Sequence, residues 1–279
     1  MKKGWQRRLP LLVCLCLLPA LAFAWTGDGH KQAAILAAQR MTGPIGELLR
    51  KEEAALLRGS VAPDREFRDF LNHVYHPRDH YGGGMDACLV QLSKVQKLMS
   101  QKAKPSQIAF EMGVLSHYVA DLHNPLHTSG GDPGESKYHS TYEQAAARDL
   151  ASWQVPRKKP KLISDPKGLI LGSVLVANKS YGSVSHAFTG GRGYSQVQAI
   201  TRSLFAEAVH TIACLWLTAA QGKVPQLVNT GYLGNKNSKI FHRTSCPSAA
   251  KMAAKNKVSF SKREEAIAKG FRPCKNCRP

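Results

Sequence analysis

The chain has 279 residues with a formal net charge of +20 at pH 7, and 43% of its residues are hydrophobic. This length allows one domain of roughly 200 residues with a proper hydrophobic core, followed by a small second unit. No internal repeat is present, and before residue 226 no run of alternating β-branched residues is long enough to build a sheet. The sequence therefore excludes a repeat protein and favours a first domain that is nearly all α.

Residues 1–24 have the layout of a secretory signal peptide, with basic residues first, an apolar run over 11–21 and Ala22-Phe23-Ala24 at the end. Because the apolar run is too short to span a bilayer, we expect cleavage before Trp25 and no transmembrane anchor afterwards. The mature protein would then be periplasmic or secreted. Cys14 leaves a lipoprotein signal as the alternative, although a large residue precedes it.

The helical segments follow from composition and apolar spacing. A helix is expected after Gly29, and helix-forming residues predict two more over 86–112 and 141–154. A short apolar helix over 167–177 and a long one over 195–220 complete the predicted domain. These helices would supply its core.

Histidines and carboxylates recur at metal-ligand spacings in one stretch of the chain. His117 and Asp121 stand four residues apart in an apolar run without proline, so on a helix they share one face. His139 and Glu143 repeat this spacing, and His127 follows a proline that redirects the chain. Imidazole and carboxylate ligands without cysteine are typical of catalytic zinc, which keeps a position for water. One such pair could be a helix-surface contact, but two pairs and a third histidine favour a metal site.

The pattern H-Y-x2-D-x3-P-x-H over 117–127, followed by HSTYE over 139–143, resembles the zinc-dependent phospholipase C family of bacteria. That family shares a fold with the single-strand-specific zinc nucleases. The resemblance implies an all-α, multi-helix domain over 25–225 with a trinuclear zinc cleft. It also implies that the mature N-terminal tryptophan is a ligand, which Trp25 would provide.

The resemblance further implies the ligands of three zinc ions. One zinc is assigned to Asp64, His73, His117 and Asp121, a second to His127, His139 and Glu143, and a third to the amino and carbonyl groups of Trp25 with His30 and an oxygen of Asp121. The assignment of Asp64 and His73 stays open, because Asp69, His76 and His80 lie in the same segment. Asp64 is also the implied general base.

The implied reaction is phosphoester hydrolysis, in which a zinc-activated hydroxide attacks phosphorus. The substrate is either a phospholipid head group or single-stranded DNA or RNA. Glu143 within HSTYE resembles the phospholipases, whereas the Trp25–His30 spacing and the basic surface resemble the nucleases. We favour a phospholipase C type of activity, with a nuclease as the alternative. A non-catalytic protein that binds zinc and polyanions is the second alternative.

The composition changes sharply in residues 226–279, which contain twelve Lys and Arg residues against two glutamates, a net charge of +10. Residues 1–24 carry four positive charges, so residues 25–225 carry only +6 of the total. His242 and Cys246 form one candidate ligand pair in this tail, and Cys274 and Cys277 form another. Thiolates at this spacing predict a closed structural zinc site on which folding of so small a unit depends.

This tail resembles the metal-binding domain of the bacterial DNA repair protein Ada through FHRTSC, NKVSF and EEAIAKGFRPCKNC. The resemblance implies a small α+β module with one zinc ion and a basic surface for DNA or another polyanion. His242 stands where the repair protein has its methyl-accepting cysteine, so that repair chemistry is not expected. Two further cysteines, Cys88 and Cys214, either form a disulfide or remain buried thiols.

Overall fold

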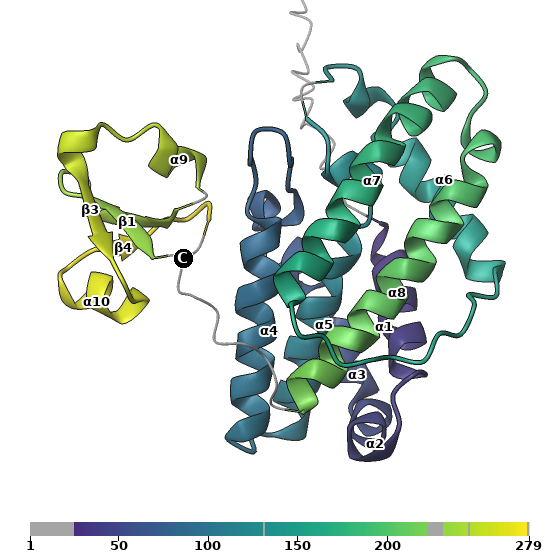
Figure 1. Cartoon of the computed structure of the whole chain (residues 1–279), viewed down its shortest axis with the longest axis horizontal. Coiled ribbons are helices and arrows are strands. Elements are labelled where there is room, and N and C mark those ends of the chain that lie inside the picture. Colours follow the sequence, from purple (N-terminus) through teal and green to yellow (C-terminus); the bar gives the residue numbers. More distant parts are fainter. Residues whose placement is uncertain (1–24, 131, 222–230, 245, 278) are drawn as a thin grey trace, which may run out of the picture.

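The computed structural model describes residues 25–130, 132–221, 231–244, 246–277 and 279. A domain of packed helices is followed in the chain by a small module that contains the strands (Figure 1). The prediction of an all-α domain with a small α+β module is therefore confirmed. The predicted signal peptide lies outside the described residues.

The helical domain is built from α-helices of 7 to 24 residues, and short helical turns lie in several of the connections between them. The α-helices are α1 (Gly27–Ala38), α2 (Gly43–Lys51), α3 (Glu53–Gly59), α4 (Gly84–Ser100), α5 (Pro105–Asp121), α6 (His139–Ser152), α7 (Pro166–Thr189) and α8 (Gln198–Ala220). The short turns are η1 (Pro63–Phe67), η2 (Phe70–His73), η3 (Pro125–His127), η4 (Glu135–Lys137) and η5 (Tyr194–Gln196).

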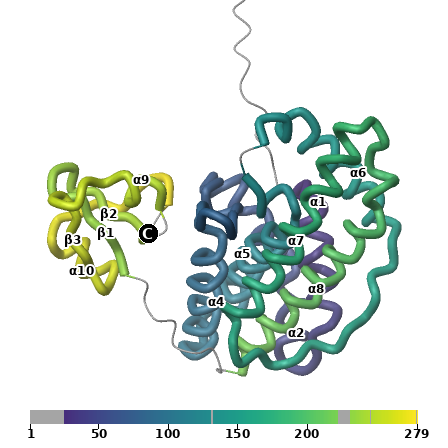
Figure 2. The backbone as a smooth tube through the Cα atoms, turned by 45° about the horizontal axis from the view of Figure 1, so that its top comes forward, coloured from purple at the N-terminus to yellow at the C-terminus, as the bar shows by residue number. Residues whose placement is uncertain are grey.

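Helix α5 is the centre of the domain, and α1, α3, α4 and α8 all contact it (Figure 2). Pro105 starts the helix, and all residues of its last three turns are buried. Helix α3 approaches α5 closely because two glycines face the contact. A Cβ on Gly59 would lie 2.0 Å from the carbonyl oxygen of Phe110, and one on Gly113 would lie 2.1 Å from that of Leu56.

Two predicted helix boundaries differ from the observed ones. The stretch 86–112 forms two helices instead of one, because the chain turns at Lys102 (φ 49°) before Pro105 opens α5. The predicted short helix 167–177 extends to Thr189, since Val184 and Ala187 bury its second half despite weak helix formers nearby. The side chain of Asp165 caps the start of this helix by accepting a hydrogen bond from Gly168 N (2.9 Å).

Helix α8 is long and apolar enough to cross a membrane, judged by length and composition alone. However, 67% of its most apolar window is buried within the fold. Trp216 is completely buried there, and its indole Nε1 donates a hydrogen bond to Met112 O (3.1 Å). These features are those of a core helix in a helical domain. Cys214 on this helix and Cys88 on α4 are both buried free thiols, so the disulfide alternative is wrong.

The small module has a four-stranded sheet in the order β3-β1-β2-β4. Its elements are β1 (Tyr232–Asn235), β2 (Ile240–Arg243), α9 (Pro247–Ala250), η6 (Ala254–Asn256), β3 (Lys257–Phe260), α10 (Arg263–Ala268) and β4 (Arg272–Pro273). Strand β1 pairs antiparallel with β2 and β3, and β2 pairs parallel with β4. Phe241, Phe260, Ala266 and Phe271 form its compact core. So small a core contributes little stability by itself.

Candidate metal centre

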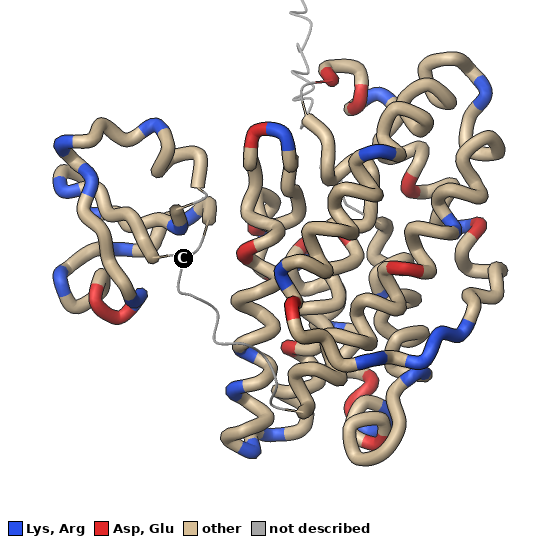
Figure 3. The backbone as a smooth tube through the Cα atoms, viewed as in Figure 1, with Lys and Arg blue, Asp and Glu red and all other residues tan. Residues whose placement is uncertain are grey.

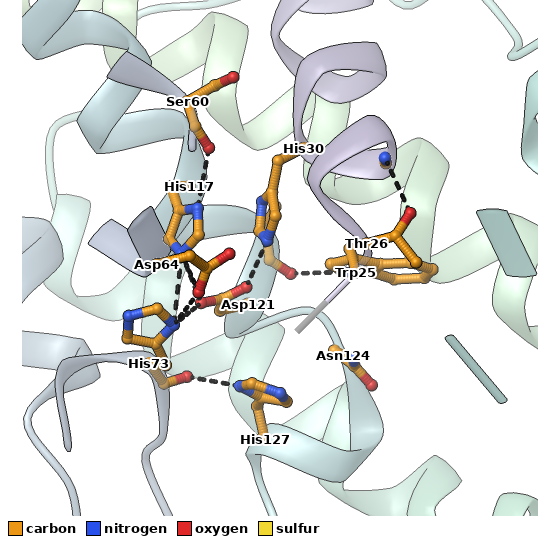
Figure 4. A network of polar contacts seen from close by, with 12 residues as sticks. Trp25, Thr26, His30, Ser60, Asp64, His73, His117, Asp121, Asn124 and His127 are labelled. Atoms are coloured by element: carbon orange, nitrogen blue, oxygen red, sulfur yellow. Dashed lines mark hydrogen bonds and ion pairs between the residues drawn. The ribbon is translucent and has the colours of Figure 1, made fainter. Parts of the chain in front are cut away.

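Side chains from α1, η1, η2 and α5 converge below the surface of the helical domain (Figure 4). Figure 4 shows His30, Asp64, His73, His117 and Asp121 turned toward one another. None is more than 6% exposed. Candidate ligand atoms of His30, Asp64 and His117 lie within 4.8 Å of one another, as do those of His73, His117 and Asp121.

Asp121 lies at the centre of this cluster because its two oxygens face different histidines. Oδ1 lies 3.2 Å from His30 Nε2, whereas Oδ2 lies 3.0 Å from His73 Nδ1 and 3.3 Å from His117 Nε2. A carboxylate in this position can bridge two cations. This arrangement agrees with the predicted sharing of Asp121 between two zinc sites, which stays a prediction.

The segment 61–85 offered five candidates, and the structure brings two of them into the cluster. Asp64 Oδ1 lies 3.5 Å from His73 Nδ1 and 3.8 Å from His117 Nε2. Asp69 lies on the far side of the His73 ring, 3.5 Å from its Nε2. His76 is half-buried against Gly130, and His80 is exposed and hydrogen-bonded to Tyr75 (2.8 Å). The geometry thus favours Asp64 and His73 as ligands.

Backbone carbonyls fix the orientation of two histidine rings. His117 Nδ1 lies 2.8 Å from Ser60 O, and His127 Nδ1 lies 3.0 Å from His73 O. A nitrogen that faces a carbonyl must carry the proton, so the Nε2 atom of each ring presents its lone pair on the opposite side. Such contacts behind a histidine are typical of metal ligands.

A second group is formed by His127 from η3 and by His139 and Glu143 from the first turns of α6. Glu143 Oε1 lies 2.8 Å from His139 Nε2 and 3.7 Å from His127 Nε2. The other nitrogen of His139 faces Glu135 (3.0 Å), and Asn124 donates a hydrogen bond to Glu143 (3.2 Å). The predicted pair on one helix face therefore meets the histidine that follows Pro125.

Several atoms of both groups lack the hydrogen bonds that buried polar atoms normally make. Within the described parts of the chain, Asp64 Oδ1, both carboxylate oxygens of Asp121 and His127 Nε2 are buried without a hydrogen bond. Burying such atoms without hydrogen bonds is costly, and a cation placed between them would remove the cost. The donor set of imidazole nitrogens and carboxylate oxygens suits zinc, so the residues fit the metal that the sequence predicts.

The raised pKa values of two histidines indicate that the carboxylates around them favour positive charge. Burial lowers the pKa of His73, but Asp121 and Asp69 outweigh this effect and raise it to about 10. Burial likewise opposes protonation of His139, whereas Glu135 and Glu143 raise its pKa to about 9. Without metal, protons therefore occupy positions that a cation would take on binding.

Trp25 lies next to the cluster and is completely buried. Its Nε1 donates a hydrogen bond to Ala120 O (2.9 Å), and its ring packs edge-on against Phe205. A side chain on Gly29 would begin 3.2 Å from Trp25 Cβ, so the glycine leaves room for the tryptophan. Trp25 is thus anchored beside Asp121, where the predicted N-terminal ligand would have to be.

One cleft of about 270 Å³ opens to solvent at the cluster. Asp64 and Glu143 lie on its walls, together with Arg65, Ser140 and Gln144. Arg65 is exposed, and its guanidinium makes no hydrogen bond or ion pair among the residues that the structure describes. A cation free at the mouth of a metal centre can contact an anionic ligand.

The module holds a separate group of four buried ligand-type residues, namely His242, Cys246, Cys274 and Cys277. His242 Nδ1 lies 3.4 Å from Cys246 Sγ. Hydrogen bonds from the Cys277 thiol and from His242 lower the pKa of Cys246, which favours its thiolate form. The predicted pairs therefore converge, as a closed zinc site requires.

Ser60, Glu135 and Asn124, which hold candidate ligands in place, were not predicted from the sequence, and Asp69 was considered only as an alternative ligand. Glu135 precedes His139 by four residues, a spacing that could have been noticed. However, Glu135 lies in a 3-10 turn before α6, so α-helical spacing would not explain why its carboxylate faces His139. Ser60 contributes a backbone carbonyl, which no side-chain pattern reveals.

Comparison with known proteins gives matches to two families. The model of the family described as zinc dependent phospholipase C matches residues 29–170, and that of the metal binding domain of Ada matches residues 217–279. The first range contains every candidate ligand of the helical domain except Trp25, and the second contains the four ligands of the module. No curated protein sequence matches the chain.

Two solved structures share the fold of the helical domain. The alpha toxin of Clostridium absonum is 14% identical, with a TM-score of 0.58 over 76% of this chain and 70% of the toxin. The alpha-toxin of Clostridium perfringens from an avian strain is 12% identical, with the same TM-score and the same two coverages. At this identity the likeness concerns the fold alone.

Proposed function

The chain belongs to the zinc-dependent phospholipase C family, and we propose that it is an exported zinc-dependent hydrolase of phosphodiesters, of the phospholipase C type. The observation that carries this proposal is the buried Asp121 carboxylate between three histidines, beside a cleft open to solvent. Buried carboxylate oxygens without hydrogen bonds next to a cleft that opens to solvent suit catalysis better than structural metal binding. Export would follow from the signal-peptide layout of residues 1–24.

The chain's own residues have distinct roles in this proposal. Zinc bound by the two groups would neutralise charge on the phosphate and lower the pKa of a bound water. Asp64 lies both in the cluster and on the wall of the cleft, so its carboxylate can accept a proton from the attacking water. Arg65 on the same wall can bind a non-bridging phosphate oxygen and orient the phosphodiester.

A single-strand-specific nuclease is the second candidate. The observation in its favour is the excess of Lys and Arg on the module, where few acidic residues oppose them (Figure 3). A basic surface attracts the phosphates of nucleic acid, and it also attracts anionic lipid head groups. We favour the phospholipid because Glu143 lies in the HSTYE segment, which resembles the phospholipases.

The test measures hydrolysis by purified, zinc-loaded protein that begins at Trp25. Phosphatidylcholine vesicles, single-stranded DNA and RNA are supplied in parallel, and a His117→Ala variant serves as the blank. Release of phosphocholine by the wild type alone is the expected result. Release of nucleotides without phosphocholine would instead establish the nuclease.

The non-catalytic alternative has its own signature in the same experiment. Protein with a full complement of zinc that hydrolyses none of the three substrates would contradict the proposed activity. A Glu143→Ala variant tests the ligand assignment separately. If it kept both its zinc content and its activity, Glu143 would not be a ligand.

A further inference from the structure

The module contacts the helical domain at η2, the turn that carries His73. Leu71 packs against the cluster of buried residues around Cys246, Cys274 and Cys277. Arg243 Nη1 donates a hydrogen bond to Asn72 Oδ1 (3.3 Å). An apolar contact and a polar contact therefore connect the turn to the zinc-binding side of the module.

Arg243 is held in place by the metal-binding group of the module. It ends β2 directly after the candidate ligand His242, and its carbonyl oxygen accepts a hydrogen bond from Cys246 N (3.0 Å). A metal held by His242 and Cys246 would fix the backbone on both sides of Arg243. The position of its guanidinium is thus linked to metal binding in the module.

A chain of contacts continues from Asn72 to His73. Asn72 is 2% exposed, and its Nδ2 donates a hydrogen bond to Asp69 Oδ2 (2.6 Å), which also accepts one from Tyr118 (2.8 Å). The other oxygen of Asp69 faces His73 Nε2 at 3.5 Å. A Cβ on Gly83 would lie 2.4 Å from Asn72 Oδ1, so the glycine leaves room for the amide in this position.

His73 is the end of this chain of contacts and part of the catalytic cluster. Its Nδ1 lies 3.0 Å from Asp121 and 3.5 Å from Asp64. If the ion pair between Asp69 and Nε2 were lost, the His73 ring could rotate. Such a rotation would move Nδ1 away from both carboxylates. Residues that support a metal-binding histidine in this way commonly change metal affinity by 10–100-fold.

We propose that Arg243 and Asn72 are positioning residues through which the zinc module holds His73 in the geometry of the catalytic metal centre. The module then acts on metal affinity and on turnover, and not only on substrate binding. The effect on turnover rests on the proposed hydrolase function. The effect on metal affinity does not.

The test uses the full chain, freed of zinc and titrated with Co²⁺. Thiolate ligands give Co²⁺ a charge-transfer band that histidine and carboxylate ligands do not give, so the module and the cluster around Asp121 can be followed separately. Three variants are compared with the wild type, namely Arg243→Ala, Arg243→Lys and Arg272→Ala. Arg272 is the control, since it is an exposed arginine of the same module whose side chain makes no hydrogen bond or ion pair in the described parts of the chain.

In Arg243→Ala, the cluster is expected to bind Co²⁺ about tenfold more weakly, while the thiolate band stays as in the wild type. Arg243→Lys keeps a donor and should recover part of the loss, and Arg272→Ala should bind as the wild type does. In an Asn72→Ala background, Arg243→Ala should cause a smaller loss than in the wild type, because the contact between the two side chains is already absent. For hydrolysis, kcat should fall while KM changes by less than about twofold.

Two results would overturn the proposal. The first is an Arg243→Ala variant whose cluster binds Co²⁺ as tightly as the wild type while its module is loaded. The second is a change confined to KM and its salt dependence, which would make the module a substrate-holding element. If the wild type hydrolysed no phosphodiester, the proposed function would fail, and the Co²⁺ titration would still decide the role of Arg243.

Discussion

Asp121 Oδ1 lies 3.2 Å from His30 Nε2, although the two residues come from different helices, α5 and α1. Both side chains are completely buried. The second oxygen of Asp121 faces His73 and His117, so one carboxylate joins all three histidines of the cluster. The approach of α1 to α5 therefore decides whether the cluster forms.

Asp121→Asn is expected to lower the zinc affinity of the cluster by at least about 100-fold, since it removes the charge of a carboxylate that we assign to two zinc sites. Asp28→Asn is the matched control, because Asp28 is exposed on α1 and pairs with Lys31 at 3.5 Å. Zinc per chain after dialysis measures the effect. If the Asp121 variant retained the wild-type zinc content, the carboxylate would not be a shared ligand.

The packing of α3 on α5 is expected to control the orientation of His117. Gly113→Ala would place a methyl group 2.1 Å from Leu56 O, so α3 must move away and withdraw Ser60 O from His117 Nδ1. Overpacking of this kind costs about 1–3 kcal/mol or more in the free energy of unfolding. Urea unfolding measures the stability, and zinc content reports the position of His117.

Gly172→Ala provides the control for this change. A Cβ on Gly172, also in a helix, would meet nothing within 4 Å, so alanine there should stabilise the protein by about 0.4–1 kcal/mol. Equal effects of the two substitutions would contradict the role given to the α3–α5 contact.

The sequence predicts the candidate ligands well where spacing along one helix determines proximity. His117 and Asp121 lie on adjacent turns of α5, and His139 and Glu143 on adjacent turns of α6, so local geometry places each pair correctly. The choice of Asp64 over Asp69 could not be made in the same way. Both aspartates are buried within one segment, and only the path of η1 and η2 shows which one faces the cluster.

The length of α7 shows that local sequence also predicts the helices of the fold only in part. Its second half contains Asn178, Ser180 and Gly182, which favour helix only weakly. The half is helical because Val184 and Ala187 are completely buried, and this depends on neighbouring elements. Local propensity could therefore predict the start of the helix at Pro166 but not its end.

Arg65 is expected to bind the substrate phosphate at the mouth of the cleft. Arg65→Ala should lower kcat/KM about 10–100-fold, the effect of losing a charged hydrogen bond, and should leave the zinc content unchanged. Arg148→Ala removes an exposed arginine of α6 that has no partner in the described residues, and it should be neutral. Steady-state kinetics on whichever of the three substrates the wild type hydrolyses provide the measurement. Loss of zinc in Arg65→Ala would show instead that Arg65 supports the metal centre.

His123 is expected to make the stability of the protein depend on pH below neutrality. The ring is completely buried between Val119 O (2.8 Å) and Thr211 Oγ1 (3.3 Å), and burial lowers its pKa from 6.5 to about 4. The unfolded chain therefore binds a proton between these two pKa values that the folded chain does not bind, so stability falls as pH falls from about 6.5 to about 4. At pH 5 the loss from this one group is about 2 kcal/mol relative to pH 8.

A His123→Gln variant keeps a donor and an acceptor but does not titrate, so its free energy of unfolding should fall less than that of the wild type over this range. Parallel pH dependences of the two proteins would show that His123 is already charged in the fold.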